Sequence, residues 1–340
     1  MKSIFSIAIA ALLIASATAT MAETPRESTS IMRVTSQHSA QIPKIEYDLI
    51  VGYIFPELFW GKANICWLGD DNLCNSSTML LDSCDNRNQG PSGCNRPDPY
   101  NSVGRLSNGC TGSIIGDRHV LTAAHCVVND TNQLKNNQLT FSLGQYDTCP
   151  WFCPYGSTAV KRVFVPKIYS ENVTNGLQRR KAADVAILEL AAPISGATPF
   201  PPPSNVDWIN IWGADLYTLG YPGDKPTGTQ WNTKGEYETM AAYPPGVQLM
   251  KTNIDGVGGQ SGSPVYILKD GKRQLVGVLI GSPVSDCENG YMWVPKLTQW
   301  MLDNVVYAAI WADWGADTSK LNIRKYSVLN STPPPSNSCM

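Results

Sequence analysis

Charged side chains are scarce in this sequence. Asp, Glu, Lys and Arg make up 16% of the 340 residues, and the formal net charge is -2, whereas average soluble domains have about 25% charged residues. Such a chain has no electrostatic attraction for nucleic acid or acidic lipid, so neither is expected as a partner. Hydrophobic residues make up 43%, enough for a globular protein of two modest domains or one large one.

Residues that bind metals are also few. The sequence has no CxxC pair and only three histidines, His38, His119 and His125, so a zinc site is not expected and no cofactor is implied. The ten cysteines are expected to pair as disulfides if the chain is exported, because the exported compartment is oxidising. The N-terminal residues, described next, indicate export.

No apolar run reaches the length of about 20 residues that crosses a membrane. At the N-terminus, Lys2 precedes a shorter apolar run and then small residues. This pattern is typical of a secretory signal peptide over residues 1–22, cleaved near Ala19 or Ala22. We therefore expect a secreted, extracellular protein. If its source is a eukaryote, four Asn-x-Ser/Thr sites could carry glycans: Asn75, Asn129, Asn172 and Asn330.

Residues 23–97 differ in composition from the rest. Four cysteines stand there among Gly, Asn, Asp and Ser: Cys66, Cys74, Cys84 and Cys94. This density can staple a small loop-rich module. We interpret residues 23–97 as a prosegment or accessory cysteine-rich region, with these four cysteines paired among themselves.

Long helical periodicity is missing until near the end of the chain. From Tyr100 onward, short apolar runs rich in β-branched residues are bounded by Gly, Pro, Asn or Asp, which is typical of the strands of sandwiches and barrels. They occupy residues 113–116, 119–124, 162–166, 185–190, 216–222 and 273–281. The proline-rich residues 199–203 predict a crossing between two halves. One helix is predicted over residues 293–306, with Pro295 in an opening position.

The candidate chemistry centres on a serine. Residues 258–265 read GGQSGSPV, and the Ser261 hydroxyl is a weak nucleophile without a neutral imidazole and an orienting carboxylate. Two of the three histidines lie in a polar stretch and in a strand-like run, where histidines are usually exposed or satisfied. His125 instead follows the apolar residues VLTAA, beside Cys126. A disulfide to Cys110 there would restrain the imidazole as catalysis requires.

Three motifs carry a family resemblance. TAAHC, DVAIL and GGQSGSPV follow in the order His, Asp, Ser, which resembles the chymotrypsin-fold serine proteases and differs from the triad order of other serine hydrolases. GYPGDKPTGTQW at 220–231 and GGQSGSPVY resemble the glutamyl-endopeptidase, or V8-like, branch. The resemblance covers roughly residues 98–304. It implies an all-β fold of two antiparallel six-stranded barrels, about 98–198 and 204–304, with a C-terminal helix and an extension over 305–340.

The resemblance also implies roles for single residues. His125 would be the general base, Asp184 the orienting acid and Ser261 the nucleophile, while the N–H groups of Gly259 and Ser261 would form the oxyanion hole. An aspartate that begins an apolar strand, as Asp184 does, is costly to bury without a hydrogen-bonding partner. The resemblance implies a disulfide between Cys110 and Cys126, and plausible pairs are Cys149–Cys153 and Cys287–Cys339.

The chain departs from the family in its activation signals. Gln260 stands where many relatives have an aspartate that pairs with a newly freed N-terminal amine, and an amide cannot replace a carboxylate in an ion pair. IVGY at 50–53 is therefore not expected to be an activation site. We expect the mature N-terminus between Asn95 and Val103.

The substrate-binding residues depart as well. Leu279 and Gly256 stand where branch members that cleave after glutamate have a histidine and a threonine, so this preference is in doubt. Asp255 lies six residues before Ser261, at the position whose aspartate gives trypsin its preference for Lys and Arg, and it could equally cap a loop. Gly281 is placed in the same pocket. An apolar pocket is an open alternative.

The sequence therefore predicts a secreted serine endopeptidase that acts on proteins or peptides as a monomer. One alternative is a catalytically silent homologue that works as an extracellular binding module through its cysteine-rich region. Another is an enzyme with the same triad that acts as an esterase or on one processing site.

Overall fold

The computed structural model describes residues 79–80, 85–93, 95–129, 131–147, 154–170, 177–281, 291–315, 317, 319 and 321–328. All of them belong to one of the two units into which the chain divides, Lys44–Met340. The expected signal peptide and all cysteines except Cys110 and Cys126 lie outside the described residues, so the other expected disulfides lie there too. Among the described residues no helix is long and apolar enough to span a bilayer.

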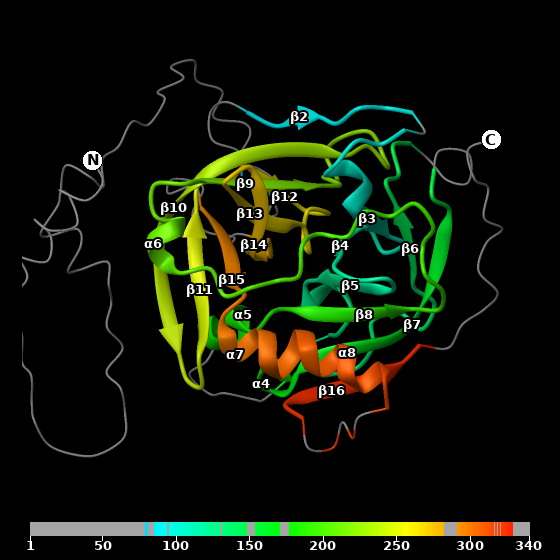
Figure 1. The fold of residues 1–340 in the computed structure, drawn as a ribbon, viewed down its shortest axis with the longest axis vertical. Coiled ribbons are helices and arrows are strands. Elements are labelled where there is room, and N and C mark those ends of the chain that lie inside the picture. Colours follow the sequence, from blue (N-terminus) through cyan, green and yellow to red (C-terminus); the bar gives the residue numbers. More distant parts are fainter. Residues whose placement is uncertain are drawn as a thin grey trace, which may run out of the picture. The chain divides into compact units, whose positions relative to one another are not determined.

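The first barrel consists of six antiparallel strands closed by pairing between β7 and β8 (Figure 1). The strands are β3 (Val103–Leu106), β4 (Thr111–Ile114), β5 (His119–Thr122), β6 (Thr140–Leu143), β7 (Ser157–Pro166) and β8 (Ala186–Leu190). A further strand, β16 (Ile323–Ser327), extends the sheet at β7. The inward residues are almost all apolar and fully buried, which explains why the short β-branched runs form strands here.

The second barrel also has six antiparallel strands and is closed by pairing between β10 and β11. The strands are β9 (Asp215–Gly220), β10 (Trp231–Tyr243), β11 (Val247–Thr252), β13 (Pro264–Lys269), β14 (Lys272–Val278) and β15 (Met292–Lys296). Two segments from the cysteine-rich region also form strands: β2 (Asn88–Gln89) extends this sheet at β10, and β1 (Met79–Leu80) forms a separate two-stranded sheet with β12 (Gly256–Val257).

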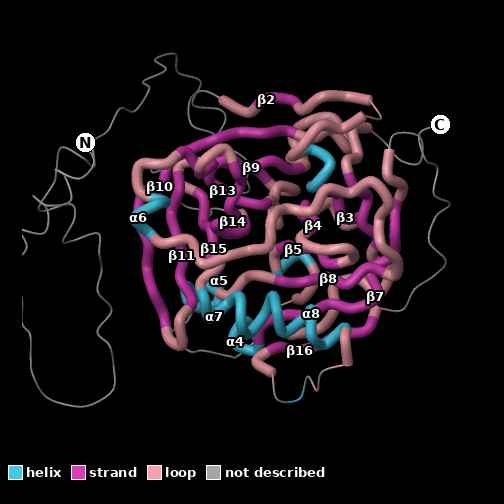
Figure 2. Tube along the Cα trace, viewed as in Figure 1, coloured by secondary structure: helices cyan, strands magenta, loops and turns pink. Residues whose placement is uncertain are grey.

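The expected fold class is confirmed, because the structure has two six-stranded antiparallel barrels and a C-terminal helix. The proline-rich residues 199–203 lie between β8 and β9 and link the barrels, as predicted. Phe200 anchors this link: it is buried, its N–H donates to Ile114 O at 2.9 Å, and its ring contacts Tyr266. Short helices lie in the loops (Figure 2): α4 (Lys167–Ser170), α5 (Leu177–Ala182) and α6 (Trp208–Ile211).

The C-terminal helix starts later than expected. Residues 292–296 form β15, and the helix runs from Gln299 to Asp313 through α7 (Gln299–Met301), a π-helical turn (Leu302–Val306) and α8 (Tyr307–Asp313). All five residues of β15 are buried, and an apolar run without alternation is compatible with either element. Thr298 caps the helix, since its hydroxyl accepts the Met301 N–H at 3.2 Å. The helix packs against β7 and β8 of the first barrel.

Buried ion pairs fasten the end of this helix. Asp313, whose side chain is 3% exposed, accepts hydrogen bonds from Arg118 at 2.7 Å and from Arg162 at 2.7 Å. His119 Nε2 lies 3.8 Å from the same carboxylate. Burial lowers the pKa of His119, against the attraction of Asp313. His119 is therefore a buried histidine of the first barrel.

Replacing Asp313 by asparagine should destabilise the fold. The change removes the charge that Arg118 and Arg162 share, and although Arg162 keeps Glu189 as a partner, we expect the free energy of unfolding to fall by about 2 kcal/mol. Urea denaturation measures this change. Asp303→Asn on the exposed face of the same helix is the matched control, with an expected change within about 0.5 kcal/mol. Equal stabilities of the two variants would contradict an anchoring role for Asp313.

Candidate active site

His125 and Asp184 meet on the first barrel. His125 lies in the 3-10 turn Ala124–Cys126 that follows β5, and Asp184 lies in the loop between α5 and β8. The backbone N–H of His125 donates to Asp184 Oδ1 at 2.8 Å, and His125 Nδ1 lies 2.7 Å from Oδ2. The Asp184 side chain is 8% exposed and that of His125 is 31% exposed. The buried carboxylate therefore holds both the turn and the ring, while the ring edge stays open to solvent.

This contact sets the protonation chemistry of the imidazole. A carboxylate oxygen accepts hydrogen bonds, so Nδ1 carries the proton that points to Oδ2, which leaves Nε2 as the acceptor whenever the imidazole is neutral. Burial would lower the pKa of His125, but the charge of Asp184 and its hydrogen bond raise the pKa above the ordinary 6.5. The arrangement is that of a base whose tautomer is fixed by a carboxylate.

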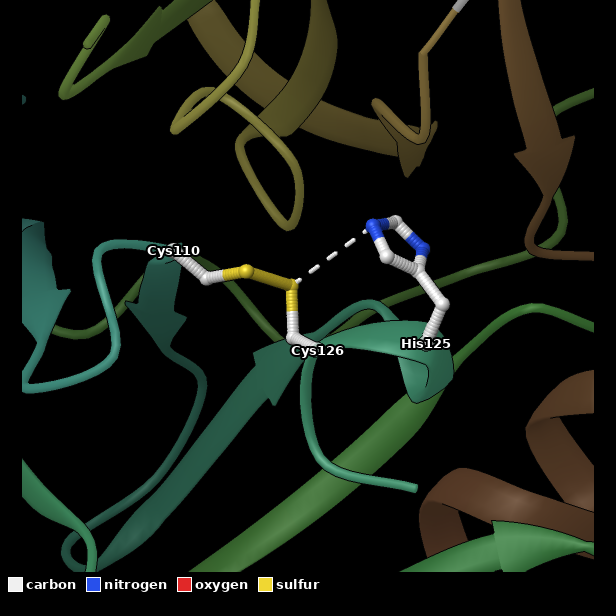
Figure 3. A group of neighbouring side chains, drawn as sticks. All are labelled: Cys110, His125 and Cys126. Carbon is white, nitrogen blue, oxygen red and sulfur yellow. Dashed lines mark hydrogen bonds between the residues drawn. A yellow bond between two sulfur atoms is a disulfide. The ribbon is translucent and has the colours of Figure 1, made fainter. Parts of the chain in front are cut away.

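The Cys110–Cys126 disulfide lies directly beside the imidazole (Figure 3). Cys126 Sγ is 3.9 Å from His125 Nε2 and 3.7 Å from the carbonyl oxygen of Ser261. Cys110, His125 and Cys126 form the only cluster of potential metal ligands in the described part of the chain. Both sulfurs are bonded to each other, so neither is available as a thiolate ligand. The disulfide instead ties β4 to the turn that bears His125.

Thr111, which the sequence analysis did not identify, carries the Ser261 loop against the first barrel. Its N–H donates to Ser261 O at 2.9 Å, and its hydroxyl donates to Gly259 O at 2.9 Å. The hydroxyl also accepts the Tyr221 N–H at 3.0 Å. Because Thr111 follows Cys110, the disulfide and these bonds fix one short stretch of β4 to both halves of the site. Its position next to Cys110 is its only signal in the sequence.

Two glycines let the Ser261 loop turn at this point. Gly259 has φ +95° and Gly262 has φ +91°, a region that side-chain-bearing residues rarely adopt. A Cβ on Gly259 would lie 2.4 Å from Tyr221 O, and one on Gly262 would lie 2.0 Å from Thr111 O. The loop thus requires glycine on both sides of Ser261 for conformation and for space.

The N–H groups of Gly259 and Ser261 are oriented by hydrogen bonds to the carbonyl groups of the same peptide units. Gly258 O accepts the Gly223 N–H at 2.7 Å, and Gln260 O accepts the Ser263 N–H at 2.9 Å. In a planar trans peptide the N–H points away from the C=O, so both N–H groups are turned from these contacts. Within the described residues neither donates a hydrogen bond, which leaves them available to a bound oxyanion.

The described residues contain no hydrogen bond between Ser261 Oγ and His125 Nε2. Both residues lie close to the same atom, Cys126 Sγ, which is near His125 Nε2 and the carbonyl oxygen of Ser261. Catalytic hydrogen bonds are often long without substrate and tighten when it binds. Gln260 is fully buried, and its Oε1 accepts the Val257 N–H at 3.0 Å. It braces the loop from inside as a neutral residue.

Three of the expected substrate-binding residues lie close together on the second barrel. A Cβ on Gly256 would lie 3.4 Å from Leu279 Cδ2 and 2.5 Å from Met292 Cε. Met292, missed in the sequence, thus belongs to the same apolar cluster, in which Leu279 and Met292 are both buried. Asp255 is 1% exposed, and its Oδ2 accepts the Asn86 N–H at 3.0 Å. Gly281, the fourth expected residue, accepts the Trp293 N–H at 2.8 Å beside the end of β14.

Residues 110–278 match the family model of the trypsin-like peptidase domain. The chain belongs to the trypsin-like peptidase family. The match contains the turn of His125, the loop of Asp184 and the loop of Ser261. The family assignment therefore agrees with the resemblance identified in the motifs.

Several relatives of this trypsin-like peptidase are glutamyl endopeptidases. That of Bacillus licheniformis is 32% identical over 171 residues, 49% of this chain and 49% of the relative. That of Staphylococcus epidermidis is 36% identical over 90 residues, 26% of this chain and 29% of the relative. Serine protease 23 of Bos taurus is 26% identical over 208 residues, 54% of this chain and 52% of the relative. The chain spans about half the length of the Bacillus and bovine relatives.

A solved structure of a Glu endopeptidase in complex with MPD has a similar fold. The likeness has a TM-score of 0.52 and 24% identity, and it covers 68% of this chain and 100% of that chain. At this identity it shows the fold alone. The two-barrel architecture of the trypsin-like peptidase is thus shared with a known enzyme structure.

Proposed function

We propose that this protein is a secreted serine endopeptidase in which His125, Asp184 and Ser261 form the catalytic triad. The observation that supports it most is the Asp184 carboxylate, which accepts hydrogen bonds from the backbone N–H of His125 and from its imidazole. A structural histidine would not need its tautomer and its turn fixed by one buried carboxylate beside a serine loop. Protein or peptide substrates and a monomeric state are part of the proposal.

The mechanism follows from the protonation states. His125 Nε2 takes the proton of Ser261 Oγ as the oxygen attacks the peptide carbonyl, and the N–H groups of Gly259 and Ser261 stabilise the oxyanion. His125 then gives the proton to the leaving amine. Water, deprotonated by the same imidazole, hydrolyses the acyl-enzyme and restores Ser261.

We further propose that the residue before the cleaved bond is apolar. Gly256, Leu279 and Met292 offer no side-chain hydrogen bond to a charged substrate group. They form an apolar cluster beside the Ser261 loop, where Leu279 O accepts the Gly262 N–H at 2.8 Å. Asp255 already accepts a hydrogen bond from Asn86, so its carboxylate is engaged within the protein. Neither a glutamate pocket nor a Lys and Arg pocket fits this arrangement.

Digestion of a mixed peptide library by the secreted protein tests both proposals. New termini are sequenced by mass spectrometry, with Ser261→Ala as the control, and a fluorophosphonate probe is mapped to its labelled residue. We expect labelling at Ser261 and cuts after apolar residues. Cuts after Glu, or after Lys and Arg, would overturn the apolar preference and leave the triad intact. No labelling and no Ser261-dependent cut would overturn the endopeptidase and favour a binding module.

A further inference from the structure

A segment of the cysteine-rich region, Asp85–Gln89, lies against the second barrel, and we call it the strap. Its β2 residues continue the sheet beside β10 (Figure 1), where Asn88 pairs with Asn232 and Gln89 with Trp231. Asn86 adds two contacts: its N–H donates to Asp255 at 3.0 Å, and its side chain hydrogen-bonds to the Thr233 hydroxyl. The strap is thus packed along the barrel that bears Ser261.

The strongest attachment of the strap is the Arg87 guanidinium, whose side chain is fully buried. It donates to both oxygens of Asp224, at 2.9 and 2.6 Å, and to both oxygens of Asp85, at 2.7 and 2.9 Å. Lys225 also donates to Asp85, at 2.7 Å. Paired bonds of this kind combine charge with fixed geometry, which lysine cannot reproduce. Arg87 therefore fixes the position of Asp224 in the loop between β9 and β10.

The loop that Arg87 holds is also the loop that orients the Gly259 peptide. Gly223 directly precedes Asp224, and its N–H donates to Gly258 O at 2.7 Å. Since the peptide is planar, this bond determines where the Gly259 N–H points. A Cβ on Gly223 would lie 3.0 Å from Gly258 O, so the two backbones are in close contact. A shift of Asp224 would be transmitted to Gly259 across one hydrogen bond.

We propose that Arg87 is a positioning residue that sets the oxyanion-binding N–H of Gly259 through Asp224 and Gly223. This inference rests on the proposed function. Gln260 cannot form the ion pair that an aspartate would form at its position, and the strap supplies an ion pair to the neighbouring loop instead. The proposal requires residues 85–89 to stay bound in the active protein. It therefore disfavours removal of the strap by maturation between Asn95 and Val103.

The test compares Arg87→Met with Arg273→Met. Arg273 also pairs with an aspartate, Asp98, beside the second barrel. Among the described residues its hydrogen bonds and ring contact reach Asp98 and Phe200, and none reaches the Gly223 loop or the Ser261 loop. We expect kcat to fall about 10²-fold in Arg87→Met, the lower range for loss of an oxyanion donor, with KM within about twofold. Affinity for a peptide aldehyde, which forms a tetrahedral adduct, should fall by a similar factor, whereas affinity for the product peptide should not.

Further variants separate positioning from stability. Asp224→Asn should give the same loss, and the double variant should lose no more than either single one, because the two residues act as one link. Arg87→Lys should lose about tenfold. Burial would raise the pKa of Asp85, but hydrogen bonds from Arg87 and Lys225 hold it well below its usual range. In the native protein the contact between Arg87 and Asp85 is therefore an ion pair from about pH 5 to 9.

The outcomes are distinct for each claim. Equal kcat and aldehyde affinity in folded Arg87→Met and Arg273→Met would overturn the role of Arg87, as would an active protein that retains no residue of the strap. If Arg87→Met does not fold, Arg87→Lys and Asp224→Asn with wild-type kcat would overturn it equally. A wild-type protein without Ser261-dependent hydrolysis would instead contradict the proposed function.

Discussion

Replacing Ser261 by alanine should lower kcat for peptide hydrolysis by about 10⁶-fold, the size of effect seen when a serine protease loses its nucleophile. The change removes the attacking oxygen and leaves the remaining parts in place. Ser261 is held through its carbonyl, which accepts the Thr111 N–H, so its hydroxyl is not needed for the loop. Residual activity over water of about 10³ to 10⁴ should remain from the oxyanion site and substrate binding.

The measurement uses a peptide identified from the library, with kcat/KM and fluorophosphonate labelling followed together. Ser113→Ala is the matched control, because Ser113 is buried in β4 and its Oγ has no partner among the described residues. Ser113→Ala should keep both activity and labelling. Comparable activity in the two variants would mean that another residue is the nucleophile, and the triad would have to be abandoned.

Much of the fold is encoded locally and could be predicted. The runs at 113–116, 162–166 and 185–190 became parts of β4, β7 and β8, because β-branched residues bounded by turn formers favour strands wherever they are buried. The long hairpin of β10 and β11 gave no such signal. Most residues of β10 are half-exposed on both faces, so its sequence lacks the alternation that marks a strand with one buried side.

Some residues of the candidate site could likewise be predicted from the sequence, and others could not. TAAHC and GGQSGSPV marked His125 and Ser261 because they pack several chemical requirements into a few residues. The identification of Asp184 depended on the order of the motifs, because its contact with His125 joins residues 59 apart in sequence. Thr111 and Arg87 could not be identified, because threonine and arginine are common and their roles arise only from tertiary contacts.

Replacing Asp184 by asparagine should lower kcat by about 10⁴-fold, although the shape of the side chain is kept. The amide nitrogen would donate to His125 Nδ1, so the ring proton would move to Nε2 and the base could no longer accept from Ser261. The amide oxygen can still accept the His125 N–H, so the turn should stay in place. The defect would therefore lie in the tautomer of the ring.

The pH profile distinguishes this cause from a loss of structure. In the native protein Asp184 raises the pKa of His125 above 6.5, so kcat/KM should rise with pH through a value above 6.5 as the imidazole becomes neutral. Without the carboxylate charge the pKa of His125 falls, and the residual activity of Asp184→Asn should rise at a more acidic pH. Asp117→Asn, in an exposed turn of the same barrel, is the control and should keep the native profile.

The drop in kcat and the acid shift of the pH profile have a common cause. The same charge that makes His125 more basic stabilises the imidazolium that forms in the transition state, so a large drop in kcat must come with an acid shift of the profile. The pair also stabilises the fold while His125 is protonated, and this contribution is lost as the pH rises through the raised pKa. Activity within tenfold of wild type and an unmoved profile would show that Asp184 does not act on His125, and its burial beside the ring would then be structural alone.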